Sequence, residues 1–206
     1  MPPQQPFRFR PARASQFTPV DDRVWWKGDR QLLLSQIVKA AIANSRRSTH
    51  FGGMEWSKIA PSFHNDGSLR DIYIRETTLN DWTCVWNFLR SGSEHLTFEV
   101  DGVAITPPLR VEDVFRQGAL HSLNASFSYG KQRINCHFFA IEEIEFDLDP
   151  RDIDGAVEAE SLATFLTALG RATLKQVLLT AENEPDTIIA RYDPTSGNII
   201  WTPMTV

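Results

Sequence analysis

The sequence has only two cysteines, Cys84 and Cys136, among its 206 residues. Two cysteines are too few for a disulfide scaffold, and their spacing matches no metal-binding motif. The chain also lacks an apolar run of the roughly 18 residues that cross a membrane and the continuous apolar segment of a secretory signal. We therefore expect a cytoplasmic protein that does not bind membranes. Both thiols should be reduced and largely buried, Cys84 in a helix and Cys136 in a strand.

Local signatures of catalysis are missing as well. The chain contains no Gly-x-Ser-x-Gly, no Gly-x-x-x-x-Gly-Lys, no His-Glu-x-x-His and no Gly-x-Gly-x-x-Gly. These motifs mark a nucleophilic serine, a phosphate-binding loop, a zinc protease and a dinucleotide site, respectively. Their absence counts modestly, because many active sites have no local motif. The sequence leans toward a protein that is not an enzyme and uses no cofactor.

Charge is distributed unevenly along the chain. Residues 1–70 hold eleven Lys or Arg against five Asp or Glu, a net charge of +6. Residues 71–206 hold ten against twenty-one, a net charge of −11. Such a chain either folds its basic part against its acidic part or offers each part to a different partner. We favour the first interpretation, because contact within one chain carries a high effective concentration.

Residues 1–21 contain five prolines and no acidic residue before Asp21, which indicates a Pro-rich basic arm. Within it, residues 7–10 read Phe-Arg-Phe-Arg. This pattern fits either a nucleic-acid contact or an arm that lies across its own domain. Three arginines carry too little charge to bind nucleic acid by themselves, so we favour the second interpretation. Residues 22–206 are expected to form a single α+β domain, in which 22–68 is a candidate helical subdomain.

The apolar periodicities predict an α+β fold, a largely antiparallel twisted sheet of about six to eight strands with three main helices packed on it. The main helices are expected at 30–46, 78–90 and 159–171, with a short helix at 111–117. The predicted strands are 69–75, 95–100, 120–129, 132–140, 143–149, 177–180, 187–192 and 198–201, with a short returning strand after the Asp101-Gly102 turn. An unbroken strand from 132 to 149 would span about 60 Å, so a bend, bulge or turn is expected near 140–142.

The stretch from Glu142 to Glu160 is the most informative, because it holds nine carboxylates and one arginine. Its first part alternates carboxylates with large apolar residues, which is the period of a half-buried strand. One side, expected in the core, consists of Ile144, Phe146 and Leu148. The other side, expected to form an outward row of carboxylates, consists of Glu143, Glu145, Asp147 and Asp149.

Same-face neighbours on a strand lie about 7 Å apart, so this acidic row favours a cationic partner. We expect a small acidic binding protein of the immunity or inhibitor type, whose acidic row covers a basic partner protein. One alternative is a metal-dependent hydrolase, in which Glu145 and Asp147 hold Mg²⁺ or Mn²⁺. His137 would join them only if the chain reverses between 137 and 145. Another is a structural subunit of a homo-oligomer, because the chain is rich in Trp and Phe.

Overall fold

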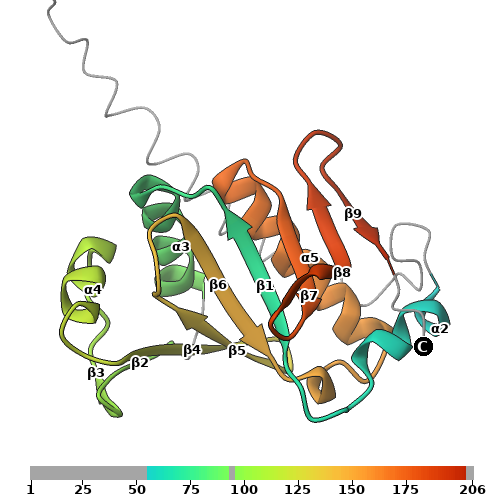
Figure 1. The fold of residues 1–206 in the computed structure, drawn as a ribbon, viewed down its shortest axis with the longest axis horizontal. Coiled ribbons are helices and arrows are strands. Elements are labelled where there is room, and N and C mark those ends of the chain that lie inside the picture. Colours follow the sequence, from blue (N-terminus) through green and yellow to red (C-terminus); the bar gives the residue numbers. More distant parts are fainter. Residues whose placement is uncertain (1–54, 93–95, 203–206) are drawn as a thin grey trace, which may run out of the picture.

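The computed structural model of the chain describes residues 55–92 and 96–202. In this part, nine strands form one antiparallel sheet in the order β3-β2-β4-β5-β6-β1-β7-β8-β9, with the long helices on one side (Figure 1). The predicted α+β class is confirmed, with slightly more strands than the six to eight expected. The predicted arm 1–21 and the predicted helix 30–46 lie outside the described residues.

The elements follow the predicted segments, and no predicted end that can be compared is displaced by more than three residues. The strands are β1 (Arg70–Arg75), β2 (Thr97–Val100), β3 (Val103–Ile105), β4 (Leu123–Tyr129), β5 (Gln132–His137), β6 (Glu143–Leu148), β7 (Val177–Ala181), β8 (Glu184–Asp193) and β9 (Asn198–Trp201). The helices are α2 (Trp56–Ile59), α3 (Leu79–Gly92), α4 (Val111–Gly118) and α5 (Ala156–Thr173), with 3-10 turns η1 (Ala60–Phe63) and η2 (Pro150–Asp152). None of the helices in the described part is long and apolar enough to cross a membrane.

Helix α3 begins with the capping box that its sequence predicts. The Thr78 amide donates a hydrogen bond to Asp81 Oδ2 at 2.9 Å, and the Asp81 amide donates to Thr78 Oγ1 at 3.4 Å. The apolar face of α3 is buried as expected and consists of Trp82, Val85, Trp86 and Leu89. This face forms part of the core between the helices and the sheet.

The two cysteines are free, and they differ in burial. Cys136, on β5, is fully buried, and burial raises the pKa of its thiol well above the usual value. Cys84, on α3, is only half-buried. The expectation that both thiols are largely buried is therefore confirmed for Cys136. Cys84 packs against the core from the flank of α3 and is less completely buried.

Helix α5 packs beside α3 and depends on one glycine. A Cβ atom placed on Gly170 would lie 2.0 Å from Tyr192 Cδ1 on β8. The close approach of β8 to the helix therefore requires glycine at this position, although glycine is a poor helix former. This contact helps to fix α5 on the sheet.

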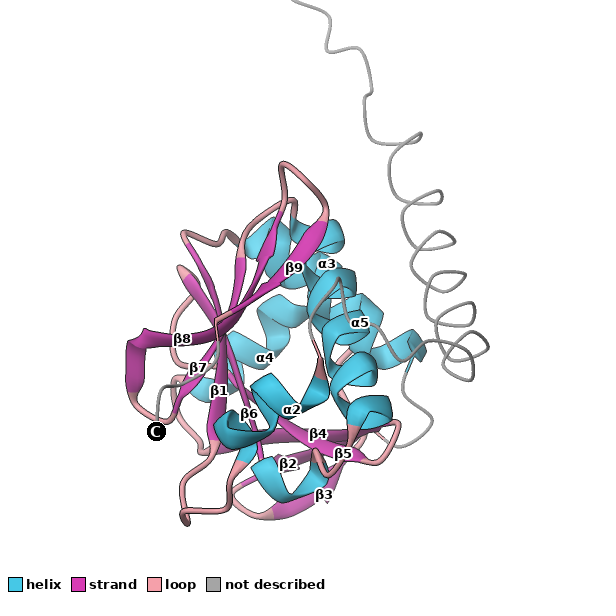
Figure 2. Ribbon diagram, turned by 90° about the vertical axis from the view of Figure 1, so that its right-hand side faces the viewer, coloured by secondary structure: helices cyan, strands magenta, loops and turns pink. Residues whose placement is uncertain are grey.

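In the described part of the chain, α3 and α5 cover one face of the sheet, and the other face carries no helix. We call this second face the helix-free face (Figure 2). Phe146 on β6 is fully buried on the covered side, with its ring 5.6 Å from that of Phe165 on α5. Strand β6 lies between β5 and β1, so its other side chains occupy the middle of the helix-free face. The first half of β8 leans out from the sheet on this side (Figures 1 and 2).

Candidate functional site

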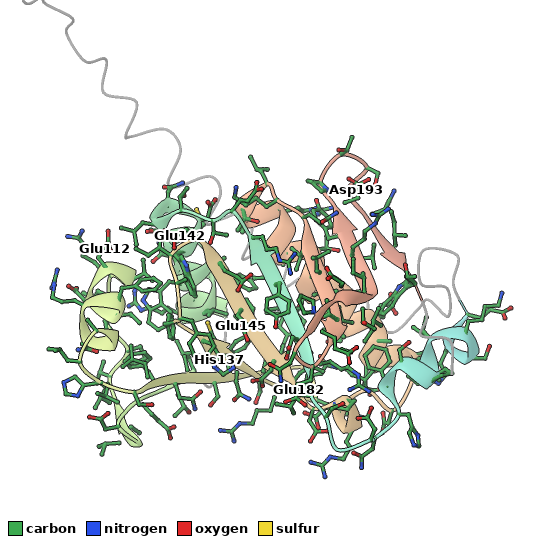
Figure 3. All side chains as sticks on the ribbon, viewed as in Figure 1. Glu112, His137, Glu142, Glu145, Glu182 and Asp193 are labelled. Atoms are coloured by element: carbon green, nitrogen blue, oxygen red, sulfur yellow. The ribbon has the colours of Figure 1, made fainter. Side chains whose placement is uncertain are left out.

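The predicted row of carboxylates lies on the helix-free face, but its members are not equally exposed. Glu143, Glu145 and Asp149 are half-buried, whereas Asp147 retains only 9% of its accessible surface. The expectation of a uniform outward row is therefore wrong for Asp147, because polar side chains of the neighbouring strands pack around it. Figure 3 shows Glu145 and His137 close together on this face.

Asp147 has its own partners within the sheet. Asn135 Nδ2 donates a hydrogen bond to Asp147 Oδ1 at 2.6 Å, and His137 Nε2 lies 2.6 Å from Oδ2. The β5–β6 hairpin brings them together, since Asn135 pairs with Asp147 and His137 pairs with Glu145 in the register. The hydrogen bond to Asp147 raises the pKa of His137, although burial of the imidazole acts in the opposite direction. Asp147 therefore positions the imidazole.

Local pairing also accounts for the two ends of the acidic row. Glu143 faces Arg75 across the β1–β6 pair, with Arg75 Nε 3.6 Å from Glu143 Oε2. Asp149 accepts a hydrogen bond from Arg151 Nε at 2.9 Å and also accepts one from the Arg151 amide at the start of η2. Arginines of the same chain thus account for these two carboxylates, which therefore do not need the cationic partner that the row was expected to favour.

Glu145 is the exception in the row. It forms no hydrogen bond or ion pair with any residue of 55–92 and 96–202. It lies between His137 on β5 and Tyr73 on β1 in the register. Burial raises the pKa of Glu145, and nearby carboxylates, Asp71 among them, raise it further, while His137 lowers it. Glu145 is therefore a half-buried carboxylate in an acidic environment, and His137 offsets its charge only in part.

A further carboxylate of the site, Asp71 on β1, was not among the predicted site residues. It pairs with Asp147 in the register, and its Oδ2 accepts hydrogen bonds from Tyr73 Oη at 2.9 Å and from the Asn183 amide at 2.8 Å. Burial is the main cause of its raised pKa. The alternation of residues 69–75 was a usable signal, because it placed Asp71, Tyr73 and Arg75 on one side of a strand. The sequence pattern did not show, however, that this strand pairs with β6.

The residues proposed as metal ligands do not form a recognisable metal centre. His137 is engaged with Asp147, and Glu145 stands beside this pair. Within the described ranges, no group of three or more His, Cys, Asp or Glu is arranged to hold an ion. The alternative of metal-dependent hydrolysis by His137, Glu145 and Asp147 therefore gains no support from the geometry and stays a prediction.

Comparison of the chain with models of protein families, with curated proteins and with solved structures finds no match. The geometry and charge of the helix-free face are therefore the basis for a functional proposal.

Proposed function

We propose that this chain is a binding protein whose helix-free face receives a basic partner protein. The observation that supports this proposal most is Glu145, a central carboxylate without an ion pair in the described part of the chain. Its raised pKa means that its surroundings disfavour its charge. A lysine or arginine from a partner would relieve this unfavourable electrostatic energy, so binding would stabilise a charge that folding does not.

The surroundings of Glu145 increase the negative potential. Asp71 and Asp147 lie on the neighbouring positions of β1 and β6, and Glu143 lies two residues away on β6. Arg75, which pairs with Glu143 in the register, is already engaged with that carboxylate. A surface with this charge balance attracts cationic partners and accelerates their association, an effect that salt reduces.

Among binding proteins, we favour an inhibitor or an immunity protein. Such a protein covers a Lys- or Arg-rich active site of another protein, and opposite charges steer the two together. A sheet face is suited to this task because its side chains are held in place before the partner arrives, which reduces the entropy lost on binding.

The proposal can be tested with a lysine-rich peptide as the probe. We expect the wild-type chain to bind the peptide, and we expect binding to weaken as the ionic strength rises. Glu145→Gln should weaken binding about two- to fivefold, the range expected for one partly exposed ion pair. Titration calorimetry at low and physiological ionic strength measures both effects.

Glu55→Gln is the matched control, because it removes the same charge at an exposed position preceding α2. It should leave the affinity unchanged. Equal weakening by Glu55→Gln and Glu145→Gln would mean that the peptide senses only the net charge of −5, and the proposal would be wrong.

A further inference from the structure

Phe139 stands out because aromatic residues are otherwise placed in the core. Among the Trp and Phe residues of 55–92 and 96–202, it is the one that is exposed, with 76% of its surface accessible. Its neighbour in sequence, Phe138, instead packs between Trp82 and Trp86 of α3. Burial of a large aromatic ring is strongly favourable. The exposure of Phe139 therefore calls for an explanation in the function of this surface.

Phe139 belongs to the same part of the molecule as Glu145. Its ring stacks on that of His137, with the ring centroids 5.2 Å apart and the planes within 6° of parallel. His137 in turn pairs with Glu145 across the β5–β6 hairpin and is held by Asp147. The hydrogen bond that His137 donates to Asp147 thus supports a flat aromatic surface at the edge of the acidic centre.

The helix-free face already holds one arginine against a ring and a carboxylate. The guanidinium carbon of Arg75 lies 5.9 Å from the centre of the Tyr73 ring, and its Nε lies 3.6 Å from Glu143 Oε2. The combination of Phe139, His137 and Glu145 offers the same two elements, an aromatic surface and a carboxylate. No cation of the described part of the chain pairs with this Glu145.

We infer that Phe139 and Glu145 together form a contact point for an arginine side chain of the partner protein. The guanidinium stacks on the exposed ring of Phe139, and its positive charge is met by Glu145. Arginine suits such a site better than lysine, because its planar group stacks on aromatic rings and is less strongly hydrated than an ammonium group. This inference rests on the proposed function and adds the residue type that the partner presents.

The test compares two peptides that differ only in carrying arginine or lysine at the same positions. We expect wild-type protein to bind the arginine peptide about two- to fivefold more tightly than the lysine peptide, the gain expected of one exposed cation–aromatic contact. Phe139→Leu should abolish this preference, because it weakens binding of the arginine peptide more than binding of the lysine peptide. Glu145→Gln should weaken both peptides. Leu120→Ala, at another exposed apolar position, is the control and should change neither.

The possible results separate the two proposals. If Phe139→Leu keeps the arginine preference, or if wild type shows none, the arginine site is wrong, while weakening by Glu145→Gln still supports a basic partner. If neither peptide binds, both proposals fall. Thermal melts accompany each measurement, and we expect Phe139→Leu to melt like wild type because the side chain is exposed.

Discussion

Phe146 and Glu145 are neighbours on β6, but their side chains lie on opposite faces of the sheet and serve different purposes. Phe146 is fully buried between the sheet and α5, where it contacts Phe127 and Phe165. Glu145 is half-buried on the helix-free face without a described partner. The covered face stabilises the fold through packing. The helix-free face retains a charge that the fold does not need, which is the property expected of a binding surface.

A second comparison lies within the helix-free face. Asp147 and Glu145 point to the same side of β6, yet Asp147 has two hydrogen-bonding partners and Glu145 has none in the described part of the chain. Asp147 therefore contributes to the structure of the site, whereas Glu145 is available to a partner. Charge pattern alone does not separate these two roles.

The largest effect is expected on the covered face. Phe146→Ala should lower the free energy of unfolding by about 3–5 kcal/mol, because it removes a buried ring and leaves a cavity. Phe146→Leu, which keeps most of the volume, should lose much less. Urea denaturation measures both variants, and a loss below about 1 kcal/mol for Phe146→Ala would show that this face is loosely packed.

A smaller loss is expected for Asp147→Asn, about 1–2 kcal/mol, because the amide replaces a charged acceptor that is buried with Asn135 and His137. The variant should also return the pKa of His137 toward its ordinary value, since the hydrogen bond that His137 donates to Asp147 is the main cause of the raised value. Histidine NMR titration reports this change. An unaltered imidazole titration would contradict the role of Asp147 as the group that positions His137.

The hydrogen-bonded pair of His137 and Asp147 should also make the free energy of unfolding depend on pH. Because the folded pKa of His137 is raised above its ordinary value of 6.5, the folded state holds the proton more tightly than the unfolded state. Its contribution is fully present below pH 6.5 and is lost as the pH rises through the folded pKa. Urea denaturation across this window should show the loss in wild type, and His137→Gln should remove this part of the pH dependence.

The smallest effect on stability is expected for Glu145→Gln, within about 0.5 kcal/mol of wild type or slightly stabilising. The raised pKa of Glu145 means that its contribution to stability is present at low pH and is lost as the pH rises through the folded value. Near pH 7 its charge is therefore unfavourable, and its removal relieves chiefly the cost of burying the charge and also the repulsion from nearby carboxylates. A loss as large as that of Asp147→Asn would place Glu145 among the structural carboxylates.

The sequence predicted which residues lie on each face of β6, but it did not predict how buried each carboxylate is or which partners it has. Period-two alternation assigned Phe146 to the core and Glu145 to the other side, because strand geometry depends only on neighbours in the chain. The partners of the row come from the register between strands. Asp71 and Arg75 belong to β1, which is distant in sequence from β6, so no local pattern could place them there. Phe139 gave no signal, because it was expected to continue a strand that ends at His137.

The most direct test of a basic-partner surface is a site-resolved NMR titration with the lysine-rich peptide, which reads every amide and the His137 imidazole together. We predict the largest shifts at Tyr73, His137 and Glu145, with little change on α4. In Glu145→Gln the same shifts should need about two- to fivefold more peptide, whereas in Glu55→Gln they should titrate as in wild type. Shifts that follow the acidic residues wherever they lie on the surface, or that leave β6 unaffected, would contradict the assignment of the helix-free face as the partner-binding surface.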